Sequence, residues 1–166
     1  MTAPAAPHAD PAPQADADRD LIGLYSKRIL ALAADIPHEG RLSAPQATAR
    51  KRSPLCGSTV TADLTLDAQG RIAEFAQEVR ACALGQAAAA VLGAQAIGRS
   101  RAEVAAAREQ LAAMLKTGGP VPAAPFEGYE VLTPARDYRN RHASILLALD
   151  ATLAAFDAAG AGSGGA

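Results

Sequence analysis

Two cysteines and one histidine are the residues of this chain whose types and settings favour metal chemistry. Cys56 stands in the stretch Ser53-Pro54-Leu55-Cys56-Gly57-Ser58, directly before a strand-like run. Cys82 stands directly before a helix-like run, and His142 opens the last helix-like run of the chain. Thiolate sulfur and imidazole nitrogen are ligands for Zn²⁺ or iron rather than for Mg²⁺ or Ca²⁺. The three side chains therefore predict a site for a soft metal, provided that the fold brings them together.

The surroundings of each cysteine bear on its chemistry. The unpaired N–H groups at the start of a helix favour a thiolate at Cys82, and Gly57 lets backbone or a bulky ligand approach Cys56 closely. The three residues are separated by 26 and 60 positions, which matches no local zinc-binding pattern. A free cysteine also often behaves as a small buried hydrophobe, and His142 can be an ordinary residue of a helix start. Residue type alone leaves both interpretations open.

Length and composition limit the class of protein. The chain has 166 residues, which fit one domain, and 49% of them are hydrophobic. A net charge of -1 gives no electrostatic basis for nucleic-acid binding, and no apolar run approaches the ~20 residues that span a membrane. The first 20 residues have no basic residue before Arg19 and no apolar stretch, unlike a signal or transit peptide. We therefore expect a cytoplasmic protein whose cysteines are thiols or ligands rather than a disulfide.

Low-complexity ends enclose one patterned region. Residues 1–18 are mostly Ala, Pro and Asp, and residues 159–166 are Ala, Gly and Ser, so we expect both to be disordered tails. The domain is expected over residues 19–158. Apolar residues at helical spacing predict a first helix over residues 21–34, which Pro37 ends.

The patterned region reads as strands followed by helices. Period-two alternation predicts a strand over residues 58–66, between strands at 47–52 and 71–80, and the imperfect alternation of the last predicts a bulge. Helices are predicted over residues 84–97, from the capping box Ser100–Glu103 onward, and over 142–158, with a Gly- and Pro-rich loop at 117–127. The predicted fold class is α+β, with a three-stranded antiparallel sheet, helices packed on one face and an added N-terminal helix.

Four stretches resemble, in order, the U-type iron–sulfur cluster scaffolds, which comprise the NifU N-terminal domain, IscU and SufU. They are Tyr25-Ser26 to Pro37-His38-Glu39-Gly40, Ser53-Pro54-Leu55-Cys56-Gly57, Ala81-Cys82-Ala83-Leu84-Gly85-Gln86-Ala87 and His142-Ala143-Ser144-Ile145-Leu146. The resemblance covers about residues 21–156 and implies the SufE/NifU-like fold, which agrees with the fold class above. It also implies cluster assembly with sulfur from a cysteine desulfurase, delivery to iron–sulfur recipient proteins, and zinc binding at the same site in many members.

The chain departs from the family pattern at two positions. Ser58 stands where the family has an aspartate, and Ala143 stands where it has its third cysteine. Cys56, Cys82 and His142 match the other ligand positions, so the resemblance implies that they hold iron, a [2Fe–2S] cluster or zinc. The segment over residues 117–130 resembles the insertion of SufU-type members, whereas His142 resembles the IscU type, and the subfamily stays open.

Three interpretations of function follow. The first is a cluster-assembly scaffold, not an enzyme, that binds iron or a labile cluster. The second is a sulfur acceptor in which Cys56 or Cys82 takes persulfide sulfur from a desulfurase. The third is a non-catalytic interaction module that has lost cluster binding. In each case we expect a monomer or weak dimer, with neither nucleic acid nor a membrane as partner.

Overall fold

The computed structural model describes residues 26–163 of the chain. The tail expected over residues 1–18 and the first part of the expected N-terminal helix lie outside the described residues. The elements, in chain order, are α2 (Lys27–Ala34), β1 (Ala47–Arg52), β2 (Thr59–Leu66), β3 (Ile72–Arg80), α3 (Ala83–Gln95), α4 (Arg101–Thr117), the 3₁₀ helix η1 (Glu127–Asp137) and α5 (Arg139–Ser163).

The strands form the expected antiparallel meander in the order β1-β2-β3. Arg52 at the end of β1 pairs with Thr59 at the start of β2, and Thr59 also pairs with Arg80 at the end of β3. Because the meander reverses direction at each turn, the β1–β2 turn and the exit from β3 lie at the same end of the sheet. This register places the Cys56 turn beside the strand end that leads to Cys82.

The predicted bulge is present near the β2–β3 turn. Thr65 pairs with Glu74, whereas Leu66 pairs with Ile72, so Ala73 is an extra residue on β3. The bulge explains why Ile72 and Phe75 are both buried although they are three positions apart.

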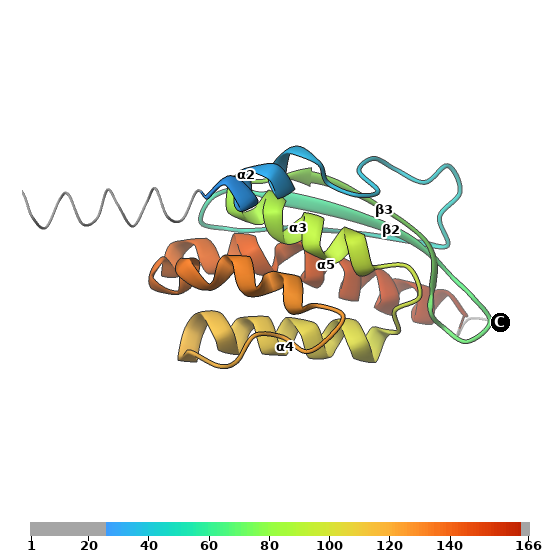
Figure 1. The fold of residues 1–166 in the computed structure, drawn as a ribbon. Helices are drawn as coiled ribbons and strands as arrows, with labels where there is room; N and C mark the ends of the chain where they lie inside the picture. Colours follow the sequence, from blue (N-terminus) through green and yellow to red (C-terminus); the bar gives the residue numbers. More distant parts are fainter. Residues whose placement is uncertain (1–25, 164–166) are drawn as a thin grey trace, which may run out of the picture.

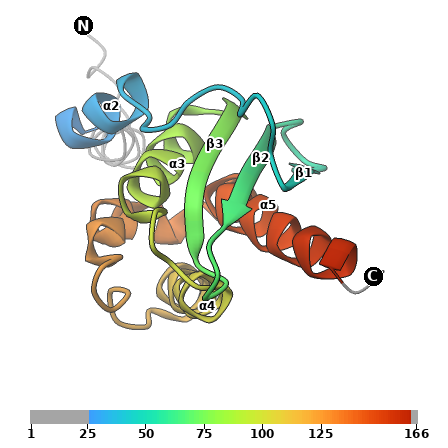
Figure 2. The same cartoon turned by 90° about the vertical axis from the view of Figure 1, so that its right-hand side faces the viewer.

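The helices cover one face of the sheet, which confirms the predicted fold class. Figure 1 shows the sheet as one layer, α3 and α5 against it, and α4 beyond them. Figure 2 shows α5 crossing behind β1 and β2, with α2 lying beside α3. The layers follow from the sequence, because a strand pattern with one apolar face must cover that face with helices.

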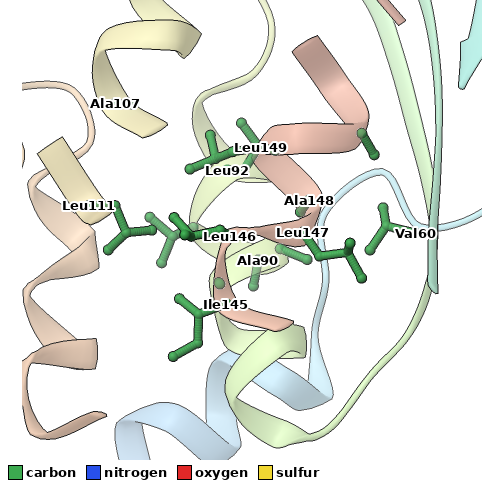
Figure 3. Close-up of a cluster of buried hydrophobic side chains, with 14 of the residues drawn as sticks. Val60, Ala90, Leu92, Ala107, Leu111, Ile145, Leu146, Leu147, Ala148 and Leu149 are labelled. Atoms are coloured by element: carbon green, nitrogen blue, oxygen red, sulfur yellow. The ribbon is translucent and has the colours of Figure 1, made fainter. Parts of the chain in front are cut away.

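The core explains the composition of α5. Figure 3 shows Leu146 pointing toward Leu111 of α4 and Leu147 pointing toward Val60 of β2, so that opposite sides of α5 are both packed. Among the described residues, the span Arg139–Gly160 is long and apolar enough to cross a membrane by length and composition, contrary to the expectation from the sequence that no run approaches this length. Most of this span is buried inside the protein. A helix that is apolar on all sides is typical of a core between two layers, and α5 occupies that place here.

Several helix boundaries differ from those predicted. The first helix was predicted over residues 21–34, whereas α2 begins at Lys27 with Ser26 as its N-cap. Residue 96 is the C-cap of α3, so the helix ends before Gly98, which adopts a φ of +86° in the following turn. α5 begins at Arg139 and continues to Ser163, whereas the sequence predicted residues 142–158 and a disordered tail from 159. The boundary at 158 is wrong because Ala159 is buried against the core and extends the packed face of the helix.

One element was missed. η1 follows the predicted Gly- and Pro-rich loop, and its side chains at positions 129, 132 and 135 are buried. A spacing of three residues is the repeat of a 3₁₀ helix, which weak local patterning does not distinguish from a loop. The capping box was correct: Ser100 Oγ accepts a hydrogen bond of 3.2 Å from the N–H of Glu103.

Candidate functional site

Cys56 lies at the tip of the β1–β2 turn. The N–H of Gly57 donates to Ser53 O at 2.9 Å, and the N–H of Ser53 donates to Ser58 O at 2.8 Å, which closes the turn. Gly57 has a φ of +71°, a conformation that glycine adopts without steric cost. The Cys56 side chain is exposed, and the neighbouring Leu55 is 77% exposed. The turn therefore presents a thiol to solvent on a closed backbone frame.

Three buried hydroxyl groups surround this thiol, and two of them connect it to the second cysteine. Cys56 Sγ lies 3.3 Å from Ser53 Oγ and 3.0 Å from Ser58 Oγ. Ser144 Oγ donates to Ser58 Oγ at 3.2 Å and lies 3.6 Å from Cys82 Sγ. The serines are 1%, 6% and 1% exposed at positions 53, 58 and 144. The structure thus brings the two predicted cysteines together in one chain of contacts, Cys56–Ser58–Ser144–Cys82, which we call the thiol–serine chain.

Cys82 is the N-cap residue of α3, as the sequence predicted, and it is partly buried. The close approach of α3 to α5 depends on Gly85, one turn further on. A Cβ at Gly85 would lie 2.6 Å from Ser144 Oγ and 2.8 Å from Ala81 Cβ, closer than real Cβ atoms come. Glycine at this position is therefore what lets Ser144 reach the start of α3.

The hydroxyl groups lower the pKa of Cys56 to about 7. The Ser53 hydroxyl is the largest cause, followed by the hydroxyl and the backbone N–H of Ser58, while partial burial opposes them. The neutral thiol donates to Ser53 Oγ; after deprotonation the hydroxyl groups rotate and donate to the sulfur. Donation to the charged form favours it, so Cys56 is more readily ionised near neutral pH than an ordinary thiol.

His142 lies on the neighbouring wall. It is 4% exposed, and its Nε2 lies 2.9 Å from Ala135 O and 3.1 Å from Arg136 O, both in η1. A carbonyl oxygen only accepts hydrogen bonds, so Nε2 carries a proton, and a neutral ring has its lone pair on Nδ1. His142 is the fourth residue of α5 rather than its first, which is why η1 can contact it.

The predicted ligand set is assembled only in part. Over residues 26–160, no group of three or more His, Cys, Asp or Glu side chains is placed to hold a metal ion. Cys56 and Cys82 are linked by hydroxyls, and His142 would have to contribute through Nδ1. The set Cys56, Cys82 and His142 stays a prediction.

A cavity of about 540 Å³ opens beside the thiol–serine chain, between β1, α4 and α5. Its wall includes Ser53, His142 and the exposed residue Ala143, the position at which the family resemblance leads one to expect a third cysteine. Four basic side chains also line it, from Arg52, Arg108, Lys116 and Arg139. The cavity therefore adjoins the cysteine site and carries positive charge.

No role was predicted from the sequence for Ser144, Gly85 or Ser53. All three lie in the stretches that carry the family resemblance, so the motifs pointed to the right segments. A small hydroxyl residue next to a ligand position is a weak signal in one sequence, because serines are common at helix starts and turns. The cavity could not be predicted from the sequence, because its cationic side chains come from three separate elements.

Comparisons with known proteins agree with this picture. The family described as the NifU-like N terminal domain matches residues 24–143. A crystal structure of a nitrogen-fixing NifU-like protein (N-terminal) from Brucella abortus is 41% identical, with a TM-score of 0.82 over 86% of this chain and 98% of that one. No curated protein matches the chain significantly.

A more distant structure supports the fold alone. It is the proposed iron–sulfur cluster assembly scaffold of the SUF system from Fervidobacterium islandicum AW-1, which is 20% identical. Its TM-score is 0.70 over 80% of this chain and 96% of that one.

Proposed function

Because the chain belongs to the family of NifU-like N-terminal domains, we propose that it is an iron–sulfur cluster assembly protein that carries iron or a labile [2Fe–2S] cluster as cargo at Cys56 and Cys82. The observation that carries this proposal is the thiol–serine chain, which joins the two thiols at one end of the sheet. Thiolates are the ligands that iron–sulfur clusters use most, and the pKa of Cys56 is lowered to about 7, which favours its thiolate.

The reduced ligand number makes the cargo labile. A [2Fe–2S] cluster usually takes four cysteine ligands, and this site offers two thiols, with His142 Nδ1 as a further donor on the cavity wall. Water or a ligand from outside the chain would fill the remaining coordination positions of the iron. Zn²⁺ accepts the same donors and is the competing metal.

Anaerobic reconstitution with ferrous iron and sulfide tests the proposal. We expect visible absorption of a bound cluster in the wild type, loss of that absorption in Cys56→Ser and in Cys82→Ser, and no change in Ser43→Ala, which alters an exposed serine away from the site. A folded wild type that stays colourless, together with a colourless Ala143→Cys variant, would contradict the scaffold and favour the interaction module.

A second function is favoured by the exposure of Cys56. A thiolate at a turn tip, with a pKa of about 7, suits attack on the outer sulfur of a desulfurase persulfide. In that step the Cys56 thiolate forms a new S–S bond with the outer sulfur. The S–S bond in the desulfurase breaks, and its cysteine leaves as a thiolate. Cys56 then carries the persulfide, with no net oxidant required.

Mass spectrometry distinguishes this function from cargo binding. We expect one added sulfur atom on Cys56 after incubation with a cysteine desulfurase and cysteine, kept in Cys82→Ser and lost in Cys56→Ser. Sulfur found on Cys82 in the wild type would contradict the assignment to Cys56.

Partners and location follow from the same proposal. A cysteine desulfurase would supply sulfur, and iron–sulfur recipient proteins would accept the cluster. The protein holds its cargo and is not itself an enzyme, and we propose that it acts as a monomer or weak dimer. A cytoplasmic location suits the two free thiols, because a reducing compartment keeps such thiols from oxidising.

A further inference from the structure

We propose that the cavity beside Ala143 binds a small anionic thiol, and that the sulfur of this thiol occupies the place of the absent third cysteine. The first half of this inference stands on the cavity alone. The second half rests on the proposed function, because it concerns a ligand to the iron cargo.

The charge of the cavity favours an anionic ligand. Its wall has the basic side chains of Arg52, Arg108, Lys116 and Arg139, and a single carboxylate, from Asp150. That carboxylate accepts a hydrogen bond of 2.9 Å from Arg108 Nε, so this pair is mutually satisfied. The other three cations have no carboxylate partner among the described residues that line the cavity, which leaves a positive surface for the carboxylates of a ligand.

The size of the cavity fits a compact metabolite. Its volume of about 540 Å³ lies within the range of roughly 300–1,000 Å³ that small-molecule sites have. Leu146 and Leu147 supply an apolar part of the wall. A thiol that carries carboxylates on a short peptide backbone matches both the basic side chains and the apolar part of the wall.

The position of the cavity ties the ligand to the cysteine site. Ser53 is on its wall, and Ser53 Oγ lies 3.3 Å from Cys56 Sγ. Ala143 is on the same wall, directly before Ser144 of the thiol–serine chain. The two cysteines do not line the cavity themselves, but a molecule that contacts both Ser53 and Ala143 adjoins the thiol–serine chain at two points, and its sulfur is assigned to that edge of the cavity. Ala143, with only a methyl group, leaves room there for a sulfur atom.

The chemistry of the cargo selects a thiol over other anions. Iron in a cluster, like Zn²⁺, binds soft sulfur ligands in preference to carboxylate or phosphate oxygen at such sites. A chain that lacks one family thiolate gains most from an external ligand of the same kind. Phosphate would satisfy the cations but would not complete a sulfur ligand set.

The cavity is tested first in the metal-free protein with glutathione as the probe. The chain has no tryptophan, so binding is followed by NMR shifts of the backbone N–H groups at positions 53 and 143. We expect saturable shifts that weaken as salt is raised. Lys116→Ala/Arg139→Ala should raise the Kd about tenfold, since each partly exposed charge contributes a few-fold. The matched control Lys27→Ala/Arg28→Ala removes the same two charges from α2 and should leave the Kd unchanged.

The ligand role is tested with Co²⁺, whose thiolate complexes absorb visibly. Glutathione should strengthen the thiolate charge-transfer band of the wild-type complex, whereas S-methylglutathione, which has the same carboxylates and no free thiol, should not. In Ala143→Cys, which supplies its own sulfur, glutathione should add nothing to the band.

Each arm can overturn a separate claim. Absence of shifts, or equal Kd values in the two double variants, would overturn the cavity assignment. Inorganic phosphate that binds as tightly as glutathione would overturn the thiol in favour of a general anion site. Binding of glutathione without any effect on the cobalt band would overturn the ligand role. A protein that binds no Co²⁺ at Cys56 and Cys82 under any condition would refute the proposed function, while the metal-free titration still decides the cavity.

Discussion

Removing the two serine hydroxyls beside Cys56 should raise its pKa toward that of an ordinary thiol. The perturbation is Ser53→Ala/Ser58→Ala, made in a Cys82→Ser background so that Cys56 is the single thiol. Both serines contact Cys56 Sγ, at 3.3 and 3.0 Å, and their hydroxyls are the largest causes of the low pKa. The backbone bonds that close the turn do not use these hydroxyls, so the turn should keep its shape.

The size of the effect can be worked out. With a pKa of about 7, half of Cys56 is thiolate at pH 7. At the ordinary value of ~8.5, roughly 3% is thiolate, about a 16-fold loss of the reactive form. A thiolate of higher pKa is also more nucleophilic, by about fivefold for this change. The alkylation rate at pH 7 should therefore fall by at most about threefold, and the midpoint of the pH–rate curve should rise by at most roughly 1.5 units, because the Ser58 backbone N–H stays in the double variant and keeps part of the shift.

The pH–rate curve of alkylation is therefore the assay, with circular dichroism to confirm folding and Ser43→Ala as the control. The same hydroxyls make the free energy of unfolding depend on pH. Because the pKa of Cys56 is lower in the folded than in the unfolded chain, the hydroxyls stabilise the fold above the ordinary thiol pKa. This contribution is lost as the pH falls through about 7. An unchanged midpoint in the double variant, or a parent midpoint already near 8.5, would refute the reasoning.

Three further outcomes are expected. Gly85→Ala should destabilise the protein by about 1–3 kcal/mol in chemical denaturation, because its Cβ would lie 2.6 Å from Ser144 Oγ. The control is Gly160→Ala, whose Cβ would meet no atom within 4 Å, and equal stability of the two variants would contradict the close approach at Gly85. Ser100→Ala should cost about 1 kcal/mol by loss of the α4 N-cap, and Ser43→Ala should not. Ala143→Cys should raise iron–sulfur loading above that of the wild type under identical reconstitution. Ser58→Asp should raise the loading less, because Ser58 is buried and bonded to Ser144, and an added carboxylate would break the thiol–serine chain. Equal loading in the wild type and Ala143→Cys would mean that position 143 does not face the cargo or that an outside ligand already fills its place.

The sequence by itself determined the elements and much of their arrangement. Alternation over residues 59–66 and the Asp67–Gly70 turn require a hairpin, and its partner strand on the other side completes an antiparallel meander. Once the meander is established, the turn that holds Cys56 and the strand end before Cys82 must share one end of the sheet. The location of the two cysteines at one end of the sheet was therefore implicit in strand periodicity and motif order.

Only the tertiary structure decided what surrounds those thiols. The contact between Ser58 and Ser144 joins residues 86 positions apart, and it depends on the absence of a side chain at Gly85. His142 donates to carbonyl groups of η1, a helix whose three-residue repeat the sequence did not reveal. The basic cavity draws its charges from β1, α4 and α5. Local propensity specifies the elements because neighbouring residues determine it, whereas the site depends on distances between elements, which are set only when the whole core packs.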